Sequence, residues 1–80
     1  MKLGILKYGR IRDLRQDRGL TQKAVADLLN VKQNTYCQYE TGTLHYPVDA
    51  VVRLAEFYAV STDYLLGLTD ETRPYPRRRT

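Results

Sequence analysis

The chain has 80 residues, the length of one small domain, and its single cysteine and single histidine exclude an internal disulfide bond and a zinc site built from these residue types. Apolar packing must therefore stabilise the fold, because a domain of this size buries only about 60% of its unfolded surface. The net charge of +4 is uneven, since residues 1–39 carry +5, residues 40–72 carry −5 and residues 73–80 carry +4. Such asymmetry favours one face that meets a polyanion and one that does not.

The first two of five predicted helices occupy about residues 8–18 and residues 22–29. Gly19 ends the first helix, because glycine readily takes the left-handed conformation found at helix C-termini. Thr21 precedes the second helix as an N-cap, and Asn30 follows it as the residue that, after glycine, best tolerates a positive φ. The apolar residues of the second helix share one face at helical spacing: Ala24, Val25, Leu28 and Leu29.

The third predicted helix, residues 33–40, has two chemically different faces. At helical spacing one face carries Thr35, Tyr36 and Tyr39, whose rings can pack on the rest of the domain. Gly42 then ends the helix. The opposite face carries three carboxamides and one thiol: Gln33, Asn34, Cys37 and Gln38.

The fourth helix is predicted over residues 48–58 and a short fifth helix over residues 62–66, where Gly67 stops it. No run of residues has the alternating pattern of a strand, so the expected fold class is all-α with five helices. Residues 69–80 lack apolar periodicity and are predicted to form a flexible basic C-terminal tail. The predicted folded domain is therefore residues 1–68.

The second and third helices, with the tight turn between them, form a candidate helix-turn-helix unit. Ala26 supplies a small side chain where the two helices would cross, and Asn30 suits the turn. Four residues at consistent offsets are predicted to anchor the unit on the core: Val25, Val31, Tyr36 and Tyr39. In this arrangement the carboxamide face of the third helix points outward, toward solvent or a partner.

The outward face has the chemistry of DNA readout. A carboxamide pairs one donor with one acceptor, as the major-groove edge of adenine does, and an α-helix fits the major groove. We expect Gln33, Asn34 and Gln38 to read bases, and Cys37 to touch a thymine methyl group. Gln22, at the start of the second helix, is expected to contact a phosphate. Three more phosphate candidates flank the third helix: Lys32, Thr41 and Thr43. The alternative is an ordinary solvated surface.

Residues 8–67 resemble the lambda-repressor-like, Cro/XRE-type helix-turn-helix domains. The resemblance is carried by the motifs "GLTQ", "YETG" and "VSTDYLLG". It implies a five-helix domain that binds double-stranded operator DNA, usually as a homodimer. It also implies base contacts from Gln33, Asn34 and Gln38, and a phosphate contact from Gln22.

The resemblance further implies an ion pair between Arg15 and Glu40 that anchors the recognition helix and lets Arg15 face a phosphate. The alternative is a surface ion pair that contributes only ~0–1 kcal/mol. Three positions depart from the family pattern. Asn30 replaces the turn glycine, Lys32 replaces the Ser/Thr cap of the third helix, and Tyr36 replaces an aliphatic residue, so that its hydroxyl needs a partner.

These patterns predict a sequence-specific DNA-binding transcriptional regulator, of repressor type, that needs no cofactor or metal. The N-terminal sequence lacks the apolar core of a signal peptide, no run approaches transmembrane length, and a lone thiol fits a reducing cytoplasm. An enzyme is not expected, because Cys37 has no paired base and His45 lies in a loop. Two alternatives stay open: an antitoxin that also neutralises a partner protein, and a protein-interaction module on the same fold.

Two further surfaces have two interpretations each. The arginines at residues 77–79 suit either a phosphate-binding arm or a solubilising end. The apolar residues of the fifth helix and its exit suit either a dimer surface or the closure of the core: Tyr64, Leu65, Leu66 and Leu68.

Overall fold

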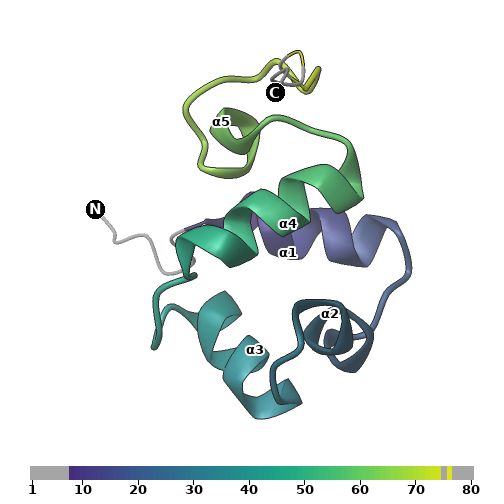
Figure 1. Cartoon of the computed structure of the whole chain (residues 1–80), viewed down its shortest axis with the longest axis vertical. Coiled ribbons are helices and arrows are strands. Elements are labelled where there is room, and N and C mark those ends of the chain that lie inside the picture. The colour runs from purple at the N-terminus through teal and green to yellow at the C-terminus, as the bar shows by residue number, and fades with distance from the viewer. Residues whose placement is uncertain (1–7, 75, 77–80) are drawn as a thin grey trace.

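The computed structural model describes residues 8–74 and residue 76, and this part of the chain forms five α-helices and no strand (Figure 1). Each helix begins and ends within one residue of its predicted limits, so the all-α five-helix prediction is confirmed. The helices are α1 (Gly9–Asp17), α2 (Gln22–Leu29), α3 (Gln33–Thr41), α4 (Val48–Tyr58) and α5 (Thr62–Leu65). Within the described residues, no helix is long and apolar enough to cross a membrane.

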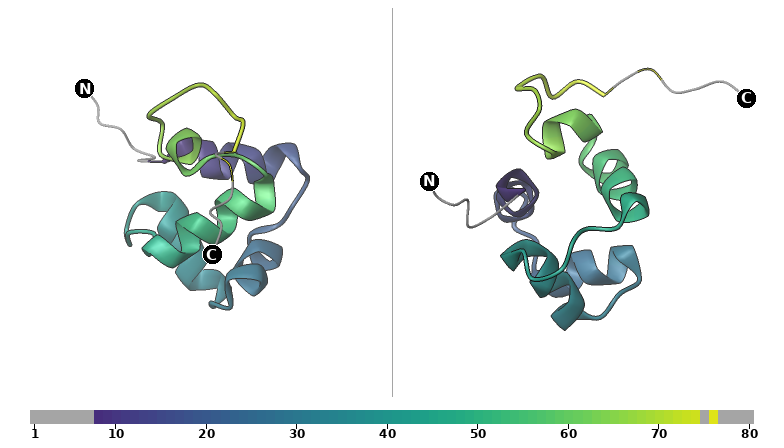
Figure 2. Two further views of the ribbon diagram at one scale, coloured as in Figure 1. Left: turned by 45° about the horizontal axis from the view of Figure 1, so that its top comes forward. Right: turned by 90° about the vertical axis from the view of Figure 1, so that its left-hand side faces the viewer.

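The helices form two packed pairs that α1 joins. α2 packs on α3, α4 packs on α5, and α1 contacts both α3 and α5. Figures 1 and 2 show the α2–α3 pair at one end of the molecule and α5 at the other. Every helix contributes to a single core, whose buried side chains are Ile11, Val25, Ala26, Tyr36, Tyr39, Leu54, Ala55, Tyr58, Val60 and Leu65.

Local chemistry sets the helix limits. The Thr21 hydroxyl accepts a hydrogen bond from the Ala24 amide at 3.0 Å, and the Ser61 hydroxyl accepts one from the Tyr64 amide at 3.0 Å. Both side chains thereby pair an amide that a helix N-terminus leaves without an intrahelical partner. Asn30 takes the predicted left-handed conformation, with φ 60°.

In the C-terminal region the structure decides one open alternative and changes one expectation. Leu65 is fully buried in the core, so it closes the domain and offers nothing to a dimer surface, whereas Leu68 is 73% exposed. Residues 69–72, which the sequence assigns to the tail, are tied to the domain. One of the contacts that tie them is a hydrogen bond of 3.2 Å from the Ser61 amide to the Thr72 carbonyl. The arginines at residues 77–79, predicted to form a phosphate-binding arm or a solubilising end, lie outside the described residues.

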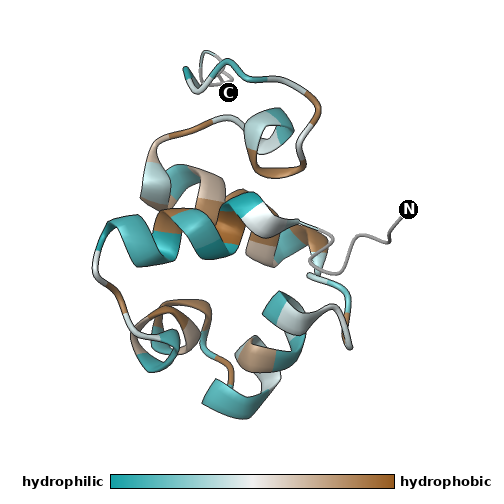
Figure 3. Cartoon of the chain, turned by 180° about the vertical axis from the view of Figure 1, so that it is seen from behind, coloured by the Kyte–Doolittle hydropathy of each residue, from teal (hydrophilic) through white to brown (hydrophobic). Residues whose placement is uncertain are grey.

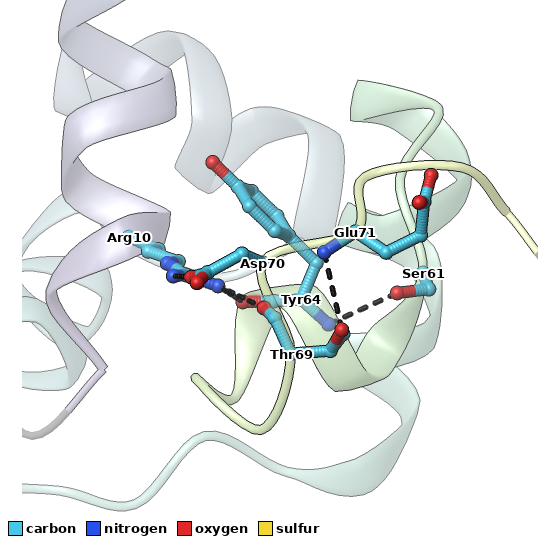
Figure 4. Close-up of polar contacts among 6 residues, drawn as sticks. All are labelled: Arg10, Ser61, Tyr64, Thr69, Asp70 and Glu71. Carbon is cyan, nitrogen blue, oxygen red and sulfur yellow. Dashed lines mark hydrogen bonds and ion pairs between the residues drawn. The ribbon is translucent and has the colours of Figure 1, made fainter.

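Arg10 of α1 holds this C-terminal segment (Figure 4). Its guanidinium donates to the carbonyls of Tyr64 and Thr69 and to the carboxylate of Asp70. It also lies 4.2 Å from the centre of the Tyr64 ring, within the range of a cation–π interaction. The contacts join residues more than 50 positions apart, at the end of the molecule away from α3.

Ala59 ends α4 in the left-handed conformation, with φ 58°, which the sequence does not predict. The left-handed region costs an L-residue with a Cβ atom about 1–2 kcal/mol, and glycine avoids most of this cost. The greater freedom of glycine in the unfolded chain offsets part of the gain.

We expect Ala59→Gly to raise the free energy of unfolding by about 1 kcal/mol in chemical denaturation. Ala24→Gly, at an exposed position inside α2, is the matched control and should lower it by about 0.5–1 kcal/mol. A loss of stability in both variants would contradict the strain assigned to Ala59.

Candidate nucleic-acid interface

The two predicted faces of α3 have opposite environments in the structure. Tyr36 is fully buried and Tyr39 is 8% exposed, so the aromatic face packs on the core. On the other face Gln33 and Asn34 are exposed, and the side chains further along are half-buried: Cys37 and Gln38. The ribbon of α3 is hydrophilic or neutral along most of its length (Figure 3). The first turn of α3 therefore presents two free carboxamides.

The turn between α2 and α3 fixes the direction of the exposed face. The Val31 amide donates to the Ala26 carbonyl at 3.0 Å, directly after the left-handed residue Asn30. Ala26 is fully buried, and a larger side chain there would push the two helices apart. Lys32 precedes α3 with extended backbone and makes no side-chain cap, and it is exposed. Its ammonium group thus remains available to an anion beside the first turn of α3.

A buried carboxylate ties α3 to both preceding helices. Glu40 accepts hydrogen bonds from Arg15 Nε at 2.7 Å and Arg15 Nη2 at 3.1 Å, and from Gln22 Nε2 at 3.0 Å. Arg15 Nη1 also donates to the Leu20 carbonyl at 2.8 Å. The side chains of Arg15 and Glu40 are only 11% and 3% exposed. The implied ion pair is therefore present as a two-pronged, buried contact rather than a surface pair.

This arrangement also defines what Arg15 and Gln22 can offer to a phosphate. The guanidinium of Arg15 directs Nε and both Nη atoms to partners inside the domain. The half-buried Gln22 amide directs one N–H to Glu40, and a carboxamide has a second N–H. Both side chains thus fix α3 on α1 and α2 first, and only their remaining donors are left for DNA.

The hydrogen bonds determine the charge state of Glu40. Burial alone would raise the pKa of its carboxyl group, but hydrogen bonds from Arg15 and Gln22 and the nearby Tyr36 hydroxyl hold the pKa below its usual value. Glu40 is thus a carboxylate at neutral pH, paired with the guanidinium of Arg15.

The sequence profile of the helix-turn-helix domain family matches residues 9–73, which is most of the chain. The chain belongs to this helix-turn-helix family. Its two-helix unit, α2 and α3, is the part whose geometry is described above, and the profile extends through α5 to the segment that Arg10 holds.

Relatives of this helix-turn-helix chain are transcriptional regulators. It is 39% identical over 70 residues to the uncharacterised HTH-type transcriptional regulator YobD of Bacillus subtilis, covering 88% of this chain and 62% of YobD. It is 47% identical over 51 residues to RstR, the cryptic phage CTXphi transcriptional repressor of Vibrio cholerae, covering 64% of this chain and 46% of RstR. The chain thus spans about half to three-fifths of the length of these relatives.

Solved structures share the fold. A transcriptional regulator from Listeria innocua matches 84% of this chain and 64% of its own, with a TM-score of 0.73 and 28% identity. The P22 c2 repressor, solved in complex with a synthetic operator, matches 80% of this chain and 97% of its own, with a TM-score of 0.69 and 25% identity. The resemblance to lambda-repressor-like domains is therefore confirmed.

The predicted phosphate contacts after α3 lie together in this helix-turn-helix domain. The hydroxyls of Thr41 and Thr43 are 3.0 Å apart, and Thr41 Oγ1 also donates to the Gln38 carbonyl at 3.2 Å. Both threonines are exposed, on either side of Gly42, whose φ is 88°. This turn presents two hydroxyls directly after the carboxamide face.

Tyr46, which sequence reasoning did not assign, packs against the rings of α3, and Tyr8, also unassigned, packs against Tyr46 in turn. The Tyr46 ring lies 5.2 Å from Tyr39, 6.5 Å from Tyr36 and 6.3 Å from Tyr8, between ring centres. Tyr46 directly precedes Pro47, the N-cap of α4. An apolar residue at that position often packs on the first turns of the following helix, and this signal could have identified Tyr46.

We expect Glu40→Gln to lower the free energy of unfolding by about 3 kcal/mol, because it removes one charge of a buried pair and leaves the Arg15 guanidinium unpaired. Glu71→Gln is the control, since the Glu71 carboxylate is 60% exposed and lies 3.6 Å from Arg73. Its effect should stay within about 0.5 kcal/mol in the same denaturation experiment. Equal stability of Glu40→Gln and wild type would contradict the anchoring role.

The pH dependence of this loss has a definite direction. The pKa of Glu40 in the folded state lies below the ordinary value of 4.5, so the ion pair contributes its full stabilisation above that pH. This contribution is lost as the pH falls through the folded-state pKa. The stability difference between wild type and Glu40→Gln should therefore shrink below pH 4.5. A difference that stays constant from neutral pH to pH 3 would contradict the assignment.

Proposed function

We propose that this domain is a sequence-specific DNA-binding transcriptional repressor of bacterial or phage type, which acts in the cytoplasm by occupying an operator. The observation that carries the proposal is the exposed carboxamide face of α3 on a fold that matches an operator-bound repressor over 80% of the chain. The family is one of regulators, and we propose no catalytic role.

The recognition step is insertion of α3 into the major groove. Gln33 and Asn34, exposed in the first turn, can each pair with the adenine edge through one donor and one acceptor. Cys37 and Gln38 lie one turn further along and are half-buried, so they meet the bases nearer the edge of the contact. Each good two-pronged contact contributes about 1–3 kcal/mol of discrimination between bases.

Phosphate contacts on either side of α3 set its register in the groove. Lys32 supplies a positive charge before the helix, and the hydroxyls of Thr41 and Thr43 after it supply neutral donors once they rotate away from Gln38 and from each other. Gln22 and Arg15 add the donors that Glu40 does not occupy. Such contacts fix orientation and carry no base information.

The test uses a duplex selected from a random pool by the purified chain. We expect the triple variant Gln33→Ala, Asn34→Ala and Gln38→Ala to lose at least about 100-fold in affinity for that duplex, because up to three base contacts are removed. Affinity for a scrambled duplex should change little, because phosphate contacts supply it. Both affinities are measured by fluorescence anisotropy over a salt series.

Gln16→Ala is the matched control for this experiment, because Gln16 is an exposed glutamine on α1, away from the carboxamide face. It should leave both affinities and their salt dependence unchanged. An unchanged preference for the selected duplex in the triple variant would overturn the base-reading role of α3.

We further propose that the domain binds DNA as a homodimer. A groove of about 360 Å³ runs along the start of α4, lined mainly by apolar side chains that include Tyr46, Val48, Val52 and Leu66. Val48 is 78% exposed and Val52 is 44% exposed. Two recognition helices of a dimer must reach half-sites about one helical turn apart, so the contact between copies must leave both α3 helices facing the same side of the duplex. This groove begins directly after the loop that leaves α3.

Val48→Asp should shift the chain from dimer to monomer in analytical ultracentrifugation, because it sets two carboxylates against each other in an apolar contact. Arg53→Ala is an exposed change on the same helix that lowers the net charge by the same one unit, and it should leave the dimer intact. A wild-type chain that stays monomeric at high concentration and on the selected duplex would contradict the proposal.

A further inference from the structure

Three tyrosine hydroxyls in the described part of the chain are buried without a hydrogen-bond partner: those of Tyr36, Tyr46 and Tyr58. Native proteins pair the large majority of their buried polar side-chain atoms, so each exception requires an explanation. The three hydroxyls come from three places in the fold, which are α3, the loop before α4, and α4 itself. They meet the core beneath the recognition helix.

Two of these three tyrosines contact each other, and one of them lies a helical turn from the buried carboxylate of Glu40. Tyr36 precedes Glu40 by one helical turn, and the rings of Tyr36 and Tyr46 are 6.5 Å apart between centres, edge to face. Glu40 Oε1 accepts hydrogen bonds from Arg15 and Gln22, whereas Oε2 accepts one from Arg15. A carboxylate oxygen can accept two hydrogen bonds, so Oε2 retains capacity for one further donor.

The electrostatics of the three tyrosines distinguish Tyr58 from the other two. Burial raises the pKa of Tyr36 first, and the adjacent Glu40 carboxylate raises it further. Burial also raises the pKa of Tyr46, while the neighbouring Tyr36 hydroxyl acts to lower it. Burial raises the pKa of Tyr58 to about 12. The Tyr58 ring contacts Phe57 and the Arg18 guanidinium, whereas the rings of Tyr36 and Tyr46 contact each other.

We propose that Tyr46, Tyr36 and Glu40 form one chain of hydrogen bonds, in which the Tyr46 hydroxyl donates to the Tyr36 oxygen and the Tyr36 hydroxyl donates to Glu40 Oε2. Forming both bonds requires the two hydroxyls, which have no partner in this structure, to turn toward Tyr36 and Glu40. Tyr46 and Tyr36 are then positioning residues for base recognition. The Tyr58 hydroxyl takes no part in this chain of hydrogen bonds.

The chain of hydrogen bonds adds a fourth element to the support of α3. Arg15 and Gln22 already connect Glu40 to α1 and α2. Tyr46 directly precedes the N-cap of α4, so its hydroxyl would connect the start of α4 to the same carboxylate. All four helices of the α1–α4 region would then share one polar centre under the carboxamide face. The positioning role rests on the proposed function, whereas the hydrogen bonds do not.

The experiment compares Tyr36→Phe, Tyr46→Phe and Tyr58→Phe in the full chain by thermal unfolding. The first two substitutions remove a link and should lower Tm by about 4–8 °C, because each loses roughly one net hydrogen bond in a small domain. Tyr58→Phe removes a hydroxyl that has no partner, so its Tm should equal or exceed that of wild type. A Tm for Tyr46→Phe at or above wild type would overturn the hydrogen-bond chain.

DNA binding tests the positioning role separately. Tyr46→Phe should reduce affinity for the selected duplex by about fivefold and leave affinity for a scrambled duplex unchanged, since only base contacts need an accurately placed α3. Tyr58→Phe should change neither affinity. A lower Tm for Tyr46→Phe with an unchanged ratio of the two affinities would overturn positioning while keeping the hydrogen bonds. A wild-type chain that binds no duplex would overturn positioning together with the proposed function, and the Tm results would still judge the hydrogen bonds.

Discussion

The carboxylate of Glu40, in the last turn of α3, accepts hydrogen bonds from α1 and α2 in a site that excludes almost all solvent. An ion pair so deeply buried is stabilising only when its geometry and remaining hydrogen bonds are good, because both charges have lost their hydration. Arg15 meets this condition with two bonds to Glu40 and one to the Leu20 carbonyl. The orientation of α3 therefore depends on this contact as well as on apolar packing.

Fixing one side of α3 leaves the other side free for a ligand. The rings of Tyr36 and Tyr39 pack into a cluster with Tyr46, so α3 cannot rotate without exposing them. Gln33 and Asn34 then stay in solvent as a consequence of what is buried opposite. The contacts of Arg10 with the C-terminal segment lie at the other end of the molecule, near α5, and stabilise the fold away from this surface.

Features controlled by neighbouring residues were predictable from the sequence. Thr21 and Asn30 mark the limits of α2 through local cap chemistry, and the alternation of rings and carboxamides defines the two faces of α3. Features that need distant residues were not predictable. The position of Tyr46 before α4 predicts that it packs, but its contacts with three other rings depend on distant residues, as the Arg10 contacts do. Ala59 gives no local sign that it adopts a positive φ.

The candidate site divides in the same way. Amide spacing on a helix identified the carboxamide face, and the resemblance supplied the partners Arg15 and Glu40. Neither source showed that Gln22 would share its amide with Glu40, because that contact requires the crossing of α2 and α3 in three dimensions. Contacts with bases and phosphates depend on the geometry of DNA as well, which no pattern within the chain encodes.

If the carboxamides of α3 enter a DNA groove, as we propose, their own NH₂ signals report it most directly. Titration of the ¹⁵N-labelled chain with the selected duplex should shift the side-chain amide resonances of Gln33 and Asn34 and leave that of Gln16 unchanged. Shifts confined to α5 or to the outer face of α1, with the Gln33 and Asn34 signals unmoved, would contradict the account.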